Sequence, residues 1–196
     1  MIKITTICLV RHGETKWNAL GKLQGSTDIP LNKRGVLQAE ECGRFLKTEK
    51  WDVMITSPLL RAKQTAHIIN EYIHVPMIEM PAFKERSYGD AEGLMPKERQ
   101  ALFPDGIYPN QEDRISLTKR VIDGLTEINR RFPNEKVLLV AHGAVINAIL
   151  YELSKGEIGS GKTKLINACI SNIECKQQLW EILSFNQVNH LSTYGE

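Results

Sequence analysis

Four short segments of the chain consist almost entirely of aliphatic and β-branched residues. They cover residues 4–10, 53–56, 75–78 and 137–141, and the third is the weakest. Runs of this kind predict strands that are buried on both faces, as in a parallel sheet covered by helices. Two later runs, residues 168–175 and 179–185, are joined by a polar turn and predict a pair of antiparallel strands.

Apolar residues recur at three- and four-residue spacing between the predicted strands, which indicates amphipathic helices. One helix is expected after the N-cap residue Asn32 as far as about residue 47, and another from Pro58 to residue 73. Two more are expected over residues 117–128 and after Gly143. The chain is therefore expected to adopt an α/β fold, a three-layer sandwich with a mostly parallel central sheet flanked by helices.

Two segments lack these regular patterns. Residues 89–113 contain three prolines among short apolar pieces, and such an insertion is a candidate lid over a site. Residues 156–162 hold three glycines and a lysine but lack the spacing and the preceding strand of a phosphate loop, so a flexible loop is expected there.

Composition narrows the class of protein. The chain has 196 residues, 42% of them hydrophobic, which is typical of one domain spanning 1–196. A net charge of +2 gives no reason to expect a nucleic-acid or membrane partner, and no apolar stretch approaches the roughly 20 residues of a membrane span. The N-terminus lacks the pattern of a signal peptide and the four cysteines form no C-x-x-C pair, so a cytoplasmic location is expected.

Chemically active residues follow the predicted strands at the points where they end. Arg11 and His12 come directly after the first run, and His142 directly after the run at 137–141. Arg61 lies in the first turn of the helix after the second run, and Glu85 follows the third. Because parallel strands have their carboxyl ends at one edge of a sheet, these residues are expected to meet there. Two cations, two imidazoles and one acid suit a phosphoryl group.

The same residues lie in an ordered set of motifs that resembles the histidine phosphatase superfamily, the phosphoglycerate-mutase-like proteins. The resemblance covers essentially the whole chain, and a set of this length is much more specific than one arginine–histidine–glycine triplet. The fold implied is phosphoglycerate-mutase-like with a short lid at about 89–113. The matching motifs are residues 9–15, Trp17-Asn18, Gln24-Gly25, Asp28, Pro30-Leu31, Gly35, Gln38-Ala39, 56–58, Arg61-Ala62, 64–66, Glu85, Gly89, Glu92-Gly93 and 141–143.

The resemblance implies a role for each catalytic residue. His12 would be the nucleophile that becomes phosphorylated, and Glu85 would be the proton donor, with Asp90 and Glu92 as the alternatives. Arg11, Arg61 and His142 would hold the phosphoryl oxygens, and we expect His142 to do so as an imidazolium.

The remaining substrate contacts are expected from Asn18, Gln24, Gly25 and Gly143. No metal site and no cofactor are expected, because the cationic side chains take the place of a metal ion.

Three functions are considered. The segment 93–114 lacks the paired arginines and the proline run of the mutases, which favours a phosphatase acting on a small phosphorylated substrate. The alternative is a cofactor-dependent phosphoglycerate mutase, and a non-catalytic phosphate-binding module is disfavoured because His12 and Glu85 are present. The sequence distinguishes neither the physiological substrate nor a monomer from a homodimer.

Overall fold

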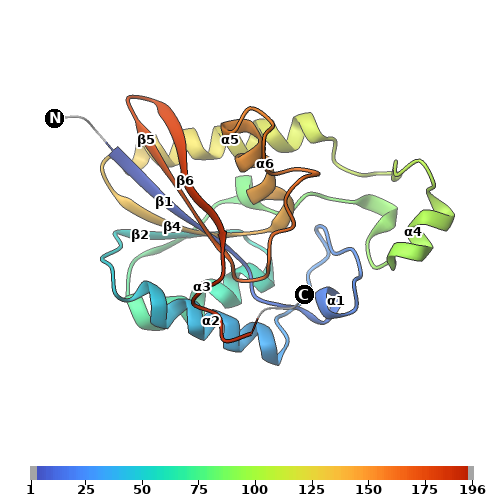
Figure 1. Cartoon of the computed structure of the whole chain (residues 1–196), viewed down its shortest axis with the longest axis horizontal. Coiled ribbons are helices and arrows are strands. Elements are labelled where there is room, and N and C mark those ends of the chain that lie inside the picture. Colours follow the sequence, from blue (N-terminus) through green and yellow to red (C-terminus); the bar gives the residue numbers. More distant parts are fainter. Residues whose placement is uncertain (1–3, 194–196) are drawn as a thin grey trace.

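A six-stranded sheet forms the centre of the computed structural model, which describes residues 4–193 (Figure 1). Its strand order is β3-β2-β4-β1-β5-β6. The first four of these strands are parallel, whereas β5 is antiparallel to both β1 and β6. The strands are β1 Ile4–Arg11, β2 Val53–Thr56, β3 Met77–Glu79, β4 Lys136–Ala141, β5 Ile170–Lys176 and β6 Leu179–Gln187.

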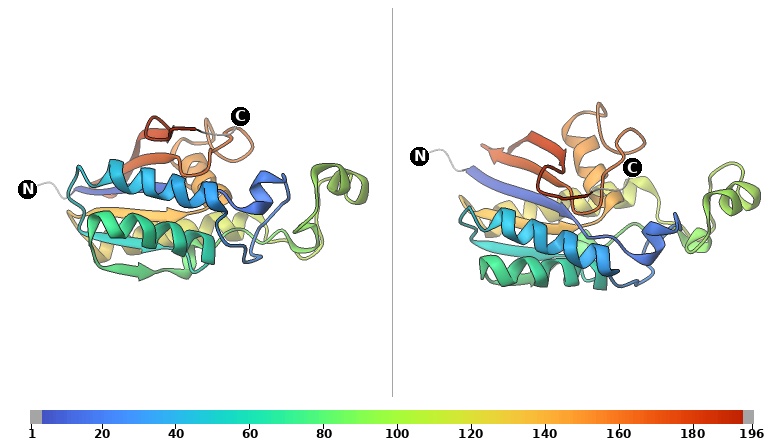
Figure 2. Two further views of the ribbon diagram at one scale, coloured as in Figure 1. Left: turned by 90° about the horizontal axis from the view of Figure 1, so that it is seen from below. Right: turned by 60° about the horizontal axis from the view of Figure 1, so that its bottom comes forward.

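Helices cover both faces of the sheet, which confirms the three-layer α/β prediction (Figures 1 and 2). Helices α2 and α3 lie side by side on one face, and α5 and α6 lie on the other. The helices are α1 Lys16–Ala19, α2 Lys33–Leu46, α3 Leu60–Ile73, α4 Pro96–Leu102, α5 Arg114–Arg131 and α6 Gly143–Leu153. Two 3₁₀ turns, η1 Pro81–Phe83 and η2 Gly89–Ala91, connect β3 to the segment that carries α4. None of the helices in the described range has the length and apolar character needed to cross a membrane.

The strand β1 shows why the apolar runs carry no polar face. Ile7 and Leu9 point into a core shared with α5 and α6, while Cys8 and Val10 point into a second core shared with α2 and α3. All four are almost fully buried. Burial of an aliphatic side chain such as Ile7 or Leu9 contributes roughly 1.5–3 kcal/mol to the stability of the fold. A strand between two helical layers must therefore be apolar at consecutive positions.

Three element boundaries differ from the sequence-based expectations. Helix α3 begins at Leu60 rather than Pro58, because Leu59 has an extended backbone with ψ 139° and is the N-cap residue. Strand β3 begins after Pro76, which has no N–H to donate to the sheet. Strand β5 begins two residues after Ala168, whose φ of 59° is incompatible with an extended strand.

The segment 89–113 extends away from the body of the molecule and contains α4 (Figure 2). Gly93 and Leu94 join it to Leu23 through two backbone hydrogen bonds of 2.7 and 3.2 Å. As the sequence predicts, this segment consists of short irregular pieces between regular helices and strands. Its role as a lid stays a prediction.

Candidate active site

The parallel register of β1, β4 and β2 brings the ends of these strands together. Arg11 is paired with Ala141 in the sheet, so His12 and His142 leave adjacent strands at the same level. Their ring centroids are 5.2 Å apart. Ser57 follows the neighbouring strand β2, and its backbone N–H donates to the carbonyl of Val140 at 3.1 Å. Sheet topology alone therefore assembles residues that are 130 positions apart in the chain.

His12 is held in the orientation that a nucleophile needs. Its Nδ1 lies 2.7 Å from the carbonyl oxygen of Gly13, an acceptor, so the ring proton is on Nδ1 and Nε2 carries a lone pair. The Nε of Arg61 donates to this Nε2 at 3.2 Å. Burial, followed by the charges of Arg61 and Arg11, holds the pKa of His12 well below its usual value. The imidazole is therefore neutral at physiological pH.

Both arginines are fixed by backbone carbonyls rather than by carboxylates. Arg61 is 1% exposed, and its Nη1 and Nη2 donate to the carbonyls of Thr27 and Gly25 at 2.9 and 2.7 Å. Arg11 donates through Nη1 to the carbonyl of Leu165, while its buried Nε has no partner in the described chain. No ion pair of the described residues involves either guanidinium. The site therefore holds two cations whose charge is not neutralised by a direct partner, which suits a dianionic ligand.

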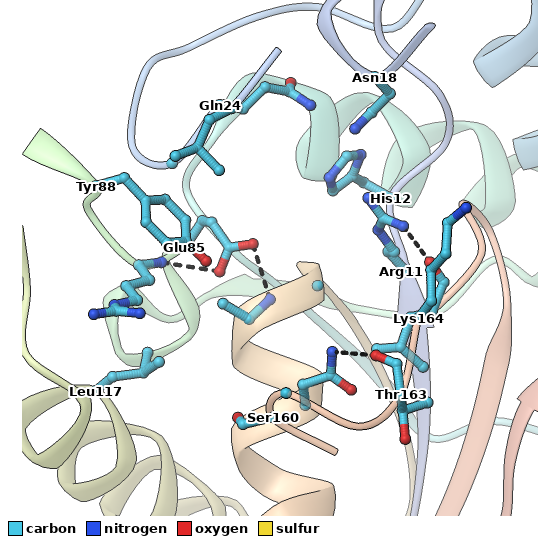
Figure 3. A pocket seen from close by; sticks show the side chains of 18 of the residues that line it. Arg11, His12, Asn18, Gln24, Glu85, Tyr88, Leu117, Ser160, Thr163 and Lys164 are labelled. Carbon is cyan, nitrogen blue, oxygen red and sulfur yellow. Dashed lines mark hydrogen bonds between the residues drawn. The ribbon is translucent and has the colours of Figure 1, made fainter. Parts of the chain in front are cut away.

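Glu85 lies at the N-terminus of α6, across the cavity from His12 (Figure 3). Its Oε2 accepts from the backbone N–H of Ala144 at 3.1 Å, and its Oε1 accepts from the N–H groups of Val145 and Arg86 at 3.3 and 2.9 Å. These donors fix the carboxyl group at the cavity wall and leave Oε2 with a free lone pair. A carboxyl group in this position can exchange a proton with a ligand in the cavity.

The two alternative acids are used elsewhere. The carboxylate of Glu92 accepts from the backbone N–H groups of Ser26, Thr27 and Tyr88 at 2.8–2.9 Å. These hydrogen bonds outweigh burial and lower the pKa of Glu92, which keeps it ionised. Asp90 binds the side chain of Asn110, and neither acid lines the cavity. The preference for Glu85 as the acid rests on this geometry.

His142 is completely buried, and its Nε2 lies 2.6 Å from the hydroxyl oxygen of Ser57. Burial, together with the charges of Arg61 and Arg11, lowers its pKa well below the usual value. In the unliganded pocket these effects favour the neutral ring over the imidazolium expected from the sequence, because the sequence does not reveal how strongly this histidine is buried among cations. Its Nδ1 has no partner within the described residues.

Asn18 and Gln24 turn their amide oxygens toward Thr15. The Oδ1 of Asn18 accepts from the backbone N–H of Thr15 at 3.1 Å and from the Nδ2 of Asn167 at 3.2 Å. The hydroxyl of Thr15 donates to the Oε1 of Gln24 at 2.8 Å. With the oxygens engaged in this way, the NH₂ groups of both side chains are free to donate to a ligand.

These groups surround a cavity of about 350 Å³ (Figure 3). All the predicted site residues except His142 line it: Arg11, His12, Asn18, Gln24, Gly25, Arg61, Glu85 and Gly143. His142 is not among the lining residues, although its chain neighbour Gly143 is. The backbone of Gly25, with φ 57°, adopts the left-handed conformation that favours glycine.

Sequence reasoning missed the outer part of the cavity. Its walls come from five separate segments, and no local motif marks them. The lid segment 89–113 contributes none of the lining residues. The loop at 156–162 was expected to be flexible only, yet it and the residues that follow supply part of the wall. The additional lining residues are Lys22, Leu23, Arg86, Tyr88, Arg114, Leu117, Ala144, Asn147, Ser160, Gly161, Thr163, Lys164 and Leu165.

Within the described range, no group of three or more histidine, cysteine, aspartate or glutamate side chains is arranged to hold a metal ion. The four cysteines are free and buried. The side chains that line the cavity offer an imidazole, guanidinium and ammonium groups, amides, hydroxyl groups and the carboxyl group of Glu85.

Comparison with known proteins agrees with this geometry. A phosphatase of Bacillus subtilis (strain 168), named uncharacterized phosphatase PhoE, is 53% identical over 97% of this chain and 99% of its own length. A metal-independent phosphoserine phosphatase of Arabidopsis thaliana is 35% identical over 98% of this chain and 86% of its own length. Relatives named phosphoglycerate mutases also match, at lower identity.

The fold comparison leads to the same group of proteins. The solved structure of Bacillus stearothermophilus YhfR superposes with a TM-score of 0.89 at 25% identity, over 95% of this chain and 98% of that structure. A family model described as histidine phosphatase superfamily (branch 1) matches residues 7–188. The chain belongs to the histidine phosphatase superfamily, and its relatives indicate a phosphomonoesterase.

Proposed function

We propose that this phosphomonoesterase hydrolyses small phosphate monoesters through a phosphohistidine formed on His12. The observation that carries the proposal is the state of that imidazole. Its proton is held on Nδ1 by the carbonyl of Gly13, its pKa is lowered by burial and by the charges of Arg61 and Arg11, and its Nε2 lone pair accepts from the buried Arg61. A neutral, oriented imidazole beside cations is suited to attack the phosphorus atom of a dianion.

In the first step, the Nε2 of His12 forms a bond to phosphorus while the bond to the ester oxygen breaks. The bound phosphoryl group replaces the lone-pair contact with Arg61 and takes the guanidinium donors of Arg61 and Arg11. The amide groups of Asn18 and Gln24 donate to the same oxygens. These donors stabilise the negative charge on the equatorial oxygens in the transition state.

Glu85 acts first as the general acid and then as the general base. It protonates the ester oxygen as that oxygen leaves, which is required when the leaving group is a poor one such as an alkoxide. The resulting carboxylate then takes a proton from water, whose oxygen attacks phosphorus as the bond to His12 breaks. Inorganic phosphate is released, and His12 and Glu85 return to their initial states.

The outer wall supports a more specific proposal, that the leaving group carries a second acidic group. Lys22, Arg114 and Lys164 line the cavity and belong to three different segments. None of these cations takes part in an ion pair of the described residues. The Arabidopsis thaliana relative and one structural relative are phosphoserine phosphatases, and phosphoserine carries a carboxylate.

The central proposal is tested by rapid quenching with ³²P-labelled substrate. Labelled protein that is stable in base and decays in acid is expected, and His12→Ala should abolish both the label and turnover. His67→Ala, an exposed histidine on α3, is the matched control and should leave both unchanged. Label that persists in the His12→Ala protein would overturn the assignment.

The leaving-group proposal is tested with phosphoserine and phosphoethanolamine, which differ by one carboxylate. Arg114→Gln and Lys164→Gln should each raise KM for phosphoserine by about two- to fivefold, as expected for loss of an exposed ion pair. KM for phosphoethanolamine should not change. Equal effects on both substrates would mean that these cations do not bind a carboxylate.

Transfer to a second hydroxyl, the mutase alternative, is measured in the same labelling experiment. Adding excess 3-phosphoglycerate to the labelled enzyme should release inorganic phosphate if the protein is a phosphatase. Label recovered in a bisphosphoglycerate would favour the mutase.

A further inference from the structure

Ser57 is a buried residue next to a member of the site but outside the cavity itself. It follows β2 directly, and it is 0% exposed. Its Oγ lies 2.6 Å from the Nε2 of His142, a short contact between two fully buried side chains. The parallel register of β2 and β4 favours this contact, because Thr56 is paired with Val140. Ser57 and His142 therefore follow the ends of two neighbouring strands at the same edge of the sheet.

Counting hydrogens assigns the direction of this bond. A serine hydroxyl has one hydrogen and two lone pairs. The backbone N–H of Leu59, which can only donate, points to Oγ at 3.3 Å and uses one lone pair. The only side-chain atom among residues 4–193 that is hydrogen-bonded to Oγ is the Nε2 of His142. If Nε2 carried a proton, Oγ would accept twice and its own hydrogen would be buried without an acceptor, which is costly.

The opposite arrangement satisfies both atoms of the contact between Ser57 and His142. The hydroxyl of Ser57 donates to an unprotonated Nε2, so the single proton of neutral His142 is on Nδ1. This Nδ1 is the buried nitrogen that has no hydrogen-bond partner among residues 4–193. An N–H there can donate to a phosphoryl oxygen, whereas a bare lone pair would repel it.

We propose that Ser57 is a positioning residue that fixes His142 in the Nδ1-protonated form and thereby makes it a neutral hydrogen-bond donor to the phosphoryl group. The part that concerns phosphate rests on the proposed function, but the tautomer itself does not. His142 needs no positive charge in this arrangement, in agreement with the cations Arg61, Arg11 and Arg120 that act on it and with the ring of His12 beside it. The acid nearest to this region, Glu85, binds the backbone of α6 instead.

The tautomer is measured in the unliganded protein by nitrogen-15 NMR of the imidazole rings, with the His142 signals assigned by their loss in His142→Gln. The wild type should give the pattern of a protonated Nδ1 and an unprotonated Nε2. Ser57→Thr keeps the hydroxyl and should keep this pattern, whereas Ser57→Ala should shift His142 toward Nε2 protonation. A wild-type His142 that is protonated on Nε2 would overturn the proposal whatever the enzyme does.

Binding of inorganic phosphate or vanadate tests the consequence. Ser57→Ala should weaken inhibition by about tenfold, the effect of one hydrogen bond, and Ser57→Thr should restore most of it. In a His142→Gln background, Ser57→Ala should have little further effect. If the losses of inhibitor binding in the two single variants simply add in the double variant, Ser57 acts on the fold and not through His142.

Ser171→Ala provides the matched control. Ser171 is equally buried and its hydroxyl accepts a backbone N–H, that of Asn186, but it lies in β5. Inhibitor binding by this variant should match the wild type, even if its melting temperature falls. If Ser171→Ala weakens inhibition as much as Ser57→Ala does, a general loss of rigidity explains both effects and the proposal fails.

Discussion

Replacing Glu85 by glutamine changes the proton chemistry of the site while preserving the size of the side chain. The Oε1 of Glu85 accepts two backbone N–H groups and Oε2 accepts one, from Ala144 at 3.1 Å. The amide oxygen of glutamine will take the position with two donors. Its NH₂ group must then face the N–H of Ala144, so one hydrogen bond is lost and the free energy of unfolding should fall by about 1–3 kcal/mol.

The effect on the reaction should depend on the leaving group. An alkoxide needs a proton as it departs, so formation of the phosphoenzyme from an alkyl phosphate should slow by about 10²–10⁴-fold in Glu85→Gln. Nitrophenolate leaves without a proton, so its release in a single turnover should be nearly unchanged. Steady-state turnover of both substrates can still slow, because Glu85 is also proposed to activate water.

The assay is the burst of nitrophenol under single-turnover conditions, compared with the rate of labelling by an alkyl phosphate. Glu152→Gln, an exposed residue on the same helix α6, is the control and should match the wild type in both. Equal slowing of both substrates in the Glu85→Gln burst would refute the proton-donor role and leave Glu85 as a residue that binds the N-terminus of α6.

Three other outcomes are expected. Burial lowers the pKa of His12 and His142 below the 6.5 of an unfolded histidine, so the unfolded chain binds more protons than the folded one. The free energy of unfolding should therefore be highest above about pH 6.5. Below that pH it should fall by up to about 1.4 kcal/mol per pH unit for each histidine. Urea denaturation between pH 7.5 and 5 measures this slope, which His12→Gln should reduce; a flat profile would contradict it. Exhaustive chelation should leave the rate unchanged, and activity that returns only with added magnesium or zinc would argue against catalysis by side chains alone. Gly35→Ala would bring a Cβ to 2.1 Å from the carbonyl oxygen of Glu14. We therefore expect the free energy of unfolding to fall by about 1–3 kcal/mol and kcat to decrease. Val36→Ala, at an exposed position, should change neither.

The main features of the fold could be predicted because burial on both faces leaves a clear sequence signal. The run that became β4 is apolar from Val137 to Ala141, and the run that became β1 is apolar from Ile7 to Val10. The residues directly after these runs are site residues: Arg11 and His12 after the first, and His142 after the second. Helix α1 carried no such signal. It has only four residues, with no room for apolar periodicity, and it depends on the capping box between Thr15 and Asn18.

The rest of the site depends on contacts that no local pattern encodes. Ser57 meets His142 across 85 positions, and Asn167 meets Asn18 across 149. The charge state of His142 cannot be predicted from the sequence for the same reason, since its pKa is lowered by burial and by arginines from other segments. A strand end indicates where polar groups gather, but the tertiary structure decides which of them are buried.

The anchoring of Arg11 and Arg61 to backbone carbonyls has a consequence for selectivity. A carboxylate partner would have to be displaced by each incoming ligand, and the energy of that exchange would differ between ligands. Carbonyl anchors leave the full cationic attraction open to every phosphate dianion, including the product of the reaction. Free phosphate should therefore compete with substrate, and the inner pocket alone has no means of telling one ester from another. We therefore expect discrimination among metabolites to come from the outer wall, whose residues take no part in the proposed chemistry.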